Sequence, residues 1–211
     1  MVIITGTEPG VIVMTGAEQS HIFFVDDEEK VLHAVQSTLM QTGAKVSCFK
    51  SATDCLGGLK LQPCDLLITD VKMPVMDGIE LIAEAKRIKP HLPVIAVTGY
   101  GDIPMAVRAL KAGARDFIEK PLERRNFLAA INSVLKESYV PDVLEGKQLT
   151  EAEMKVLRLI LEGHSNKEIA ALLHRSVRTI EDHRGHIMRK VGAENIVGLV
   201  KRAYRLGLLH Y

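Results

Sequence analysis

The sequence predicts an α/β fold with a doubly wound five-stranded parallel sheet, followed by a small all-α helix-turn-helix domain of four helices. The first observation is a strict alternation of short apolar runs and amphipathic stretches over residues 21–137. Such alternation is typical of a parallel sheet covered on both faces. The second observation is that the patterns of residues 149–211 are all helical.

The predicted strands are five short apolar runs. They are HIFFV (21–25), KVSCF (45–49), CDLLIT (64–69), PVIAVT (93–98) and ARDFIE (114–119). The five predicted helices alternate with them and have apolar residues at helical spacing. They cover residues 28–43, 51–62, 78–89, 103–113 and 122–138. Because crossovers between parallel strands are right-handed, this order makes the sheet doubly wound.

Residues 138–148 combine proline, glycine and mixed charges without periodicity, which indicates a linker. The helical patterns beyond it cover residues 149–163, 165–174, 176–192 and 193–207. The first two begin with capping boxes, Thr150 with Glu153 and Ser165 with Glu168. A very tight turn at His174 joins the second and third patterns, which is helix-turn-helix spacing.

Composition limits the classes of function. The chain has 211 residues, enough for two small domains, and a net charge of +1. Residues 1–141 hold 15 basic and 17 acidic residues, whereas residues 142–211 hold 12 and 9, so the tail is the part that could meet a polyanion. No apolar stretch approaches the roughly 20 residues of a membrane span, and the three cysteines are expected to be reduced thiols. We therefore expect a cytoplasmic protein without membrane contact.

Residues 1–20 are interpreted as an N-terminal leader of unknown role. The segment lacks the basic residues that begin a signal peptide. A loose leader, a short hairpin and a true start at Met14 all remain open.

Four predicted strands end in polar side chains. Asp26 and Asp27 follow the first strand, Asp70 the third, Thr98 the fourth and Lys120 the fifth. Parallel sheets bind ligands outside the carboxyl ends of their strands. Carboxylates gathered there would repel one another without a hard cation, and Mg²⁺ prefers oxygen ligands. The sequence therefore predicts a magnesium site at which Asp70 accepts a phosphoryl group, since a carboxylate is a competent nucleophile.

Other readings of this cluster are weaker. Strand-end acids often face water or cap the next helix. Here, however, the polar side chains that follow four different predicted strands all fit the same kind of site. A phosphatase of the haloacid dehalogenase type would need a second aspartate where Lys72 stands. A flavodoxin-like cofactor site would need a phosphate-cradling loop after the first strand, where the acidic stretch DDEEK stands instead.

Residues 21–137 resemble the receiver domain of two-component response regulators through the motifs FFVDDE, LLITDVKMPVMDG, AVTG and DFIEKP. The resemblance implies that a sensor histidine kinase phosphorylates Asp70. It also implies a Mg²⁺ site made by Asp26, Asp27, Asp70 and the main-chain carbonyl of Lys72. The implied switch residues are Thr98, Phe117 and Lys120, and the Lys120–Pro121 peptide bond is expected to be cis.

The tail, residues 149–211, resembles the LuxR/FixJ-type DNA-binding domain through LTEAEMKVLRLILEGHSNKEIAALLHRSVRTIEDHRGHIMRKVG. By that likeness Ser176–Lys190 is the recognition helix, with Glu181, Asp182, Arg184 and Gly185 at or near base-facing positions. The implied DNA-binding residues are Lys167, Ser176, Arg178, Thr179, Glu181, Asp182, His183, Arg184, Gly185, Arg189 and Lys190. The fourth helix, about 194–206, is the helix through which the family commonly dimerises.

These observations predict a two-component response regulator that controls transcription. No enzymatic activity is expected beyond self-phosphoryl transfer to Asp70 and slow autodephosphorylation. Expected partners are double-stranded DNA, RNA polymerase and a second copy of the chain after phosphorylation, through a face formed by residues 103–113 and 114–119. The mixed charges of that face are Arg108, Lys111, Arg115, Asp116 and Glu119.

Two alternatives stay open. The acids in the recognition helix leave room for a phosphorylation-gated protein-interaction module whose tail does not bind DNA. The other alternative is that the tail resembles sigma-factor region four and contacts polymerase. That region shares the helical fold but is not fused to a receiver domain.

Overall fold

The computed structural model describes residues 20–99, 102–136, 149–206 and 208, and the proposed leader and linker lie almost wholly outside these ranges. The described strands are β1 (His21–Val25), β2 (Lys45–Phe49), β3 (Leu66–Asp70), β4 (Val94–Thr98) and β5 (Asp116–Glu119). They form one parallel sheet in the order β2-β1-β3-β4-β5. The predicted sheet is confirmed, and the order reverses beside β1, where a doubly wound sheet binds its ligands.

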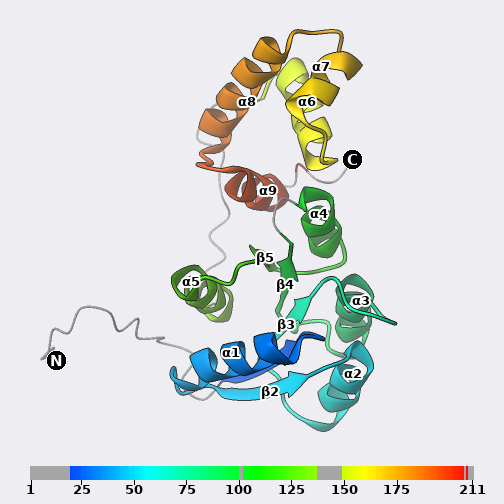
Figure 1. Ribbon diagram of the computed structural model, residues 1–211, viewed down its shortest axis with the longest axis vertical. Helices are drawn as coiled ribbons and strands as arrows, with labels where there is room; N and C mark the ends of the chain where they lie inside the picture. The colour runs from blue at the N-terminus through cyan, green and yellow to red at the C-terminus, as the bar shows by residue number, and fades with distance from the viewer. Residues whose placement is uncertain (1–19, 100–101, 137–148, 207, 209–211) are drawn as a thin grey trace, which may run out of the picture.

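Five helices cover the two faces of the sheet (Figure 1). They are α1 (Glu29–Met40), α2 (Ala52–Leu61), α3 (Gly78–Ile88), α4 (Ile103–Lys111) and α5 (Arg124–Leu135). Successive strand residues point to opposite faces, so Phe24 packs with α1 and α5 while Phe23 packs with α2 and α3. All five residues of β1, β3 and β4 are buried, as expected for central strands covered on both sides.

The C-terminal part is helical, as predicted. Its helices are α6 (Glu151–Leu161), α7 (Asn166–Leu172), α8 (Val177–Val191) and α9 (Ile196–Arg205). Both predicted capping boxes are present, at Thr150 with Glu153 and at Ser165 with Glu168. Helix α8 ends at Gly192, whose φ of 71° lies in the left-handed region that glycine adopts most readily.

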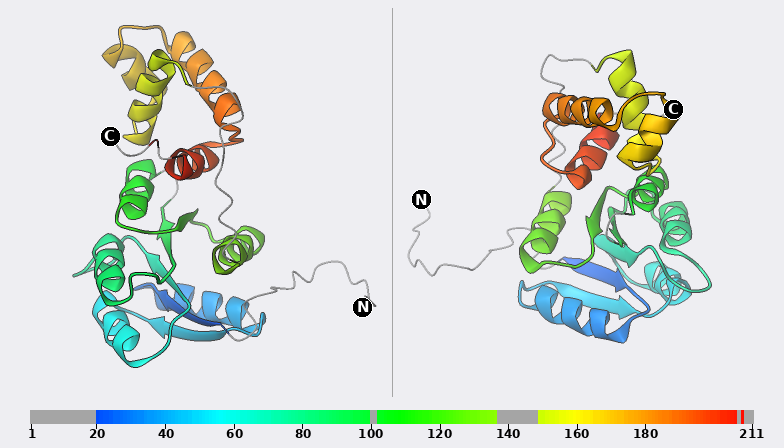
Figure 2. Two further views of the ribbon diagram at one scale, coloured as in Figure 1. Left: turned by 180° about the vertical axis from the view of Figure 1, so that it is seen from behind. Right: turned by 45° about the horizontal axis from the view of Figure 1, so that its top comes forward.

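The helical domain rests on the receiver-like domain through α9. Figures 1 and 2 show α9 lying across the end of α4 and beside β5. Leu199, Val200 and Ala203 of α9 are almost fully buried, and they belong to the same apolar cluster as Phe117 of β5 and Ala106 of α4. One hydrophobic core therefore continues from one domain into the other.

Among the described helices none combines the length and apolar character needed to cross a membrane.

Candidate functional site

Three carboxylates meet at the carboxyl end of the sheet. One oxygen each of Asp26, Asp27 and Asp70 can be chosen so that all three lie within 4.8 Å of one another. Asp26 is fully buried and Asp70 is 6% exposed, whereas Asp27 is open to solvent. The structure thus brings together the acids that the sequence placed on neighbouring strand ends.

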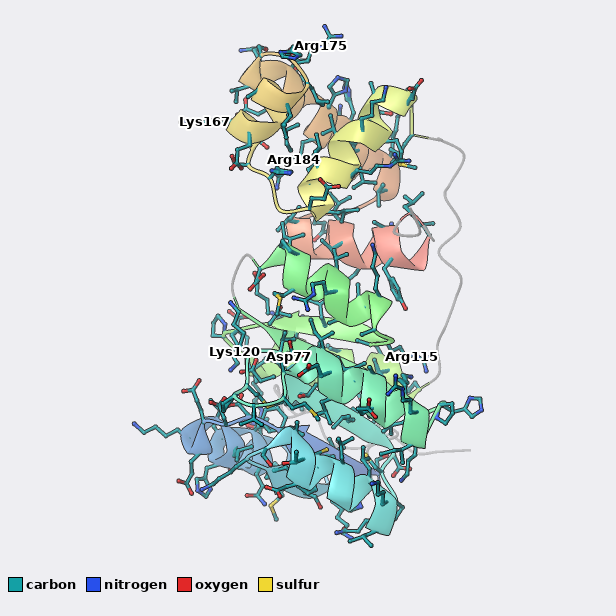
Figure 3. The ribbon with its side chains drawn as sticks, turned by 90° about the vertical axis from the view of Figure 1, so that its right-hand side faces the viewer. Asp77, Arg115, Lys120, Lys167, Arg175 and Arg184 are labelled. Carbon is teal, nitrogen blue, oxygen red and sulfur yellow. The ribbon has the colours of Figure 1, made fainter. Side chains whose placement is uncertain are left out.

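Lys120 joins two of these acids. Its Nζ lies 2.9 Å from Oδ2 of Asp70 and 3.1 Å from Oδ2 of Asp26. The Lys120–Pro121 peptide bond is cis, as expected. Figure 3 shows Lys120 at the same end of the sheet as Asp77, the capping residue of α3, and opposite Arg115. Lys120 is therefore a fixed positive charge within the acid cluster.

Burial and charge shift two pKa values in the cluster. Burial raises the pKa of Asp26 above its usual value, although a hydrogen bond from Glu28 N and the Lys120 ammonium both act to lower it. Burial alone would lower the pKa of Lys120, but Asp70 and Asp26 outweigh it, so that pKa is raised. Lys120 therefore keeps its proton at neutral pH.

The donor set fits a divalent metal ion. Three carboxylates and one ammonium group leave an excess negative charge in a mostly buried space. Because hard cations such as Mg²⁺ prefer oxygen ligands and retain several waters, a half-open group of three carboxylates suits this ion. Because Asp27 is exposed, the cluster is open to solvent on its side.

The loop after Asp70 is held tightly to the strand. Gly78 N donates to the carbonyl oxygen of Val71 at 2.9 Å. A Cβ atom on Gly78 would lie 2.0 Å from the backbone oxygen of Asp70, so only glycine permits this approach. Lys72 N lies 3.5 Å from Oδ1 of Asp70, and the Lys72 side chain turns outward to Asp102 at 2.8 Å.

The other two expected switch residues, Thr98 and Phe117, lie on β4 and β5, one and two strands away from Asp70. Thr98 ends β4 and is 2% exposed, and its carbonyl oxygen accepts from Lys120 N at 2.8 Å. Phe117 of β5 is 3% exposed. A small cavity between them is lined on its other side by α9 residues Ile196, Val197 and Val200.

A charged contact between the domains was not anticipated from the sequence. Nζ of Lys201 in α9 lies 3.0 Å from Oδ1 of Asp116 and 5.2 Å from the ring centroid of Phe117. The same Asp116 oxygen accepts from Phe117 N at 2.8 Å. Asp116 is only 5% exposed, so it is not freely presented on the mixed-charge face where the sequence placed it.

Helix α8, the expected recognition helix, presents most of its predicted DNA-binding residues to solvent. The exposed residues at the start of α8 and along it are Ser176, Arg178, Glu181, Asp182, Gly185 and Arg189, and Lys167 of α7 is exposed as well. Thr179 and His183 are half-buried. Ser176 Oγ accepts from Thr179 N at 3.1 Å and caps α8. A Cβ atom on Gly185 would meet no atom within 4 Å, so packing within the chain does not require this glycine. Its surface is open for close approach of a ligand.

Two further predicted DNA-binding residues, Arg184 and Lys190, have partners in other helices of the domain. Nζ of Lys190 lies 2.6 Å from Oε2 of Glu153, which is 4% exposed. Burial would raise the pKa of Glu153, but Lys190 and the hydrogen bonds from Thr150 lower it to about 2. Arg184 donates from Nη1 to Oδ1 of Asn166 at 3.0 Å. Lys190 therefore closes an internal ion pair, and Arg184 is held by a residue of α7.

Comparisons with known proteins match both domains. The family model of the response regulator receiver domain matches residues 22–132, and that of bacterial regulatory proteins of the luxR family matches residues 147–203. The response regulator protein TodT of Pseudomonas putida is 39% identical over 196 residues, covering 89% of this chain and 86% of TodT. The transcriptional regulatory protein FixJ of Rhizobium meliloti is 38% identical, covering 86% of this chain and 94% of FixJ.

Solved structures give the same likeness. The crystal structure of full-length FixJ from B. japonicum has a TM-score of 0.53 and 33% identity, and the match covers 90% of this chain and 98% of that one. The structure of the response regulator StyR has a TM-score of 0.51 and 34% identity, covering 88% and 98%. The likeness therefore extends over both domains.

Proposed function

This chain belongs to the two-component response regulators that join a receiver domain to a LuxR-type DNA-binding domain, and we propose that phosphorylation of its Asp70 by a histidine kinase controls binding to DNA. The observation that carries the proposal is the cluster of Asp26, Asp27 and Asp70 with Lys120 between two of them. A cytoplasmic location follows from this proposal, because the DNA is there.

The phosphoryl transfer uses the geometry of the cluster. A carboxylate oxygen of Asp70 attacks the phosphorus of a phosphohistidine, a P–O bond forms, and the P–N bond to the imidazole breaks. Asp26, Asp27, Asp70 and the carbonyl of Lys72 would hold Mg²⁺, which when bound offsets the charge of the phosphoryl oxygens. Lys120, whose Nζ lies 2.9 Å from Asp70, offsets more of the negative charge of the phosphoryl group. The hydroxyl of Thr98 can donate a hydrogen bond to a phosphoryl oxygen.

The activity is regulatory. The only chemistry proposed for the chain is acceptance of its own phosphoryl group and the slow hydrolysis of that group by water. The output is a change in binding to double-stranded DNA, which in turn changes transcription by RNA polymerase.

The contact of α9 with α4 and β5 gives the proposal a physical link. A single recognition helix offers few base contacts, so a dimer on two half-sites is expected. The receiver face and the helix expected to dimerise cover each other within one chain. We propose that phosphorylation, sensed at Thr98 and Phe117, weakens this contact and frees both surfaces for dimerisation on an inverted-repeat site.

Changing Asp70→Asn should abolish phosphorylation. Wild-type protein incubated with acetyl phosphate and Mg²⁺ should gain the mass of one phosphoryl group, because Asp70 lies beside Lys120 and the other acids and, unlike the fully buried Asp26, is partly open to solvent. Intact mass measured at once after quenching reads this gain. EDTA should prevent it, and Asp54→Asn, on the exposed surface of α2, should leave it unchanged. Phosphate on the Asp70→Asn protein would refute the site.

Lys120→Ala should separate phosphorylation from response. Mg²⁺ can still hold the phosphoryl group, but the ammonium that joins Asp70 to β5 is lost. We expect the variant to gain phosphate and yet show less than a third of the rise in DNA affinity seen in wild type, measured by fluorescence anisotropy. A threefold loss corresponds to about 0.7 kcal/mol of coupling. Lys120→Arg is the control for charge alone. An equal rise in wild type and Lys120→Ala would count against the role.

A second candidate function rests on the two exposed acids Glu181 and Asp182 of α8. Their negative charges repel the phosphates of DNA, so the tail could instead bind a protein once Asp70 is phosphorylated. A gel shift of the phosphorylated chain against genomic fragments separates the two functions. Binding to a subset of fragments supports the first, and no binding to any fragment supports the second.

A further inference from the structure

The guanidinium group of Arg184 is held by a residue of the neighbouring helix. Nη1 of Arg184 in α8 donates to Oδ1 of Asn166, the first residue of α7, at 3.0 Å. Both side chains are half-buried. In Figure 3 Arg184 lies at the turn that joins α6 to α7, at the same end of the domain as Lys167. The hydrogen bond fixes the direction of a long side chain that would otherwise be mobile.

Arg184 does not share the outward face of α8. It lies four residues after Ile180 and three before Ile187, and residues at these spacings lie on the same side of a helix. Ile180 and Ile187 are both fully buried. The outward face belongs instead to Arg178, Asp182 and Gly185. Arg184 therefore stands at the edge where α8 meets α7.

The partner of Arg184 is neutral. An amide oxygen orients a guanidinium group but does not cancel its charge, and the other N–H groups of the planar fork stay able to donate. Lys190 on the same helix offers a contrast, because the carboxylate of Glu153 cancels its charge at 2.6 Å. Among the ion pairs of the described residues, none includes Arg184. Arg184 is thus an oriented and uncompensated positive charge.

We propose that Arg184 binds a backbone phosphate of duplex DNA, beside Lys167, and that Asn166 is the positioning residue that aims it. Phosphate contacts lie at the flanks of a recognition helix and fix its register, whereas base contacts lie on its outward face. The edge position of Arg184 and its neutral anchor both fit the first role. The inference rests on the proposed DNA-binding function.

The test measures affinity and its dependence on salt for the full-length, acetyl phosphate-treated chain. The probes are a duplex enriched from a random library by the wild-type protein and a scrambled duplex of the same length. Fluorescence anisotropy over a series of KCl concentrations gives the dissociation constant and the slope of log affinity against log salt for each. Loss of one phosphate contact lowers the slope by about one and weakens both duplexes alike, whereas loss of a base contact weakens the specific duplex alone.

We expect Arg184→Met to weaken both duplexes by a similar factor of about ten and to lower the salt slope by about one. Asn166→Asp should reproduce most of this loss, because a carboxylate cancels the charge that the amide leaves free. Asn166→Ala should cost about threefold in wild type and nothing further in the Arg184→Met background, since a residue that acts only through Arg184 has no effect without it. Lys155→Met, on α6, removes an exposed lysine elsewhere and should leave the slope unchanged.

Three outcomes would overturn the inference. A loss confined to the selected duplex would make Arg184 a base-reading residue. A further loss from Asn166→Ala in the Arg184→Met background would make Asn166 a residue with its own structural or contact role. Thermal unfolding of each variant identifies a loss of DNA affinity that is due to misfolding. If one of the other variants misfolds, Asn166→Asp, which keeps the size of the side chain, tests the inference in its place. Absence of binding by the wild type to either duplex would overturn the proposed DNA-binding function together with this inference.

Discussion

Replacing Glu153 with leucine is expected to lower the free energy of unfolding of the C-terminal domain by about 2–3 kcal/mol. The substitution leaves the half-buried Lys190 side chain without the carboxylate that lies 2.6 Å from its ammonium group. It also removes the acceptor for Thr150 N at 2.7 Å, which caps α6. Because small domains are stable by only about 5–15 kcal/mol in total, the effect should be large. Hydrogen exchange of α6 and α8 peptides, read by mass spectrometry, measures it locally.

The matched control removes both charges. Glu153→Leu with Lys190→Met removes both charges of the pair, so most of the stability should return, apart from the lost cap. If the double variant is as unstable as Glu153→Leu alone, the ion pair is not the cause. Lys190→Met on its own also tests whether Lys190 binds phosphate, because an unchanged salt slope for DNA binding would assign it to the internal pair.

The same pair gives a dependence on pH. The pKa of Glu153 is lowered in the folded chain to about 2, against a usual value of 4.5. A depressed carboxyl pKa contributes stability that is fully present above the unfolded value and is lost as the pH falls through the folded one. The C-terminal domain should therefore lose stability between about pH 4.5 and pH 2. In the double variant this loss should be smaller.

Lys190 also illustrates what sequence reasoning reaches and what it misses. Spacing and capping residues predicted each described helix and strand, with differences of a few residues at their ends, because these patterns are local. The pairing of Lys190 with Glu153 joins residues 37 positions apart. Whether an exposed-looking lysine faces DNA or a buried acid depends on how α6 packs against α8, which no local pattern records.

The acid cluster was predictable for a different reason. The topology puts the carboxyl ends of β1 and β3 side by side, which brings Asp26 and Asp70 together, and the long side chain of Lys120 reaches them from the end of β5. The contact of Lys201 with Asp116 could not be inferred in this way. It joins two domains across residues 137–148, and neither the sheet order nor the helix pattern constrains where α9 rests.

Lys201→Glu is expected to open the contact between the domains. A glutamate at this position would face Asp116, which is 5% exposed, and would lose the ammonium that lies 5.2 Å from the centre of the Phe117 ring. Like charges in a half-buried contact repel, so α9 should leave α4 and β5. If that contact restrains DNA binding, the unphosphorylated variant should bind a selected duplex about five- to 100-fold more tightly than unphosphorylated wild type, as expected for couplings of about 1–3 kcal/mol. Fluorescence anisotropy gives this ratio.

The sign of this change excludes a trivial explanation. An added glutamate repels DNA, so tighter binding cannot come from the new charge itself. Lys155→Glu, which makes the same change of charge on exposed α6, should bind DNA no more tightly than wild type. Asp116→Asn in the Lys201→Glu background removes the repulsion and should restore part of the contact of α9 with α4 and β5. Small-angle scattering would detect this as a smaller radius of gyration than that of Lys201→Glu alone. If Lys201→Glu leaves both the radius of gyration and the DNA affinity at wild-type values, the contact of α9 with β5 does not control DNA binding. The proposed link between Asp70 and DNA binding would then have to run through another surface of the receiver domain.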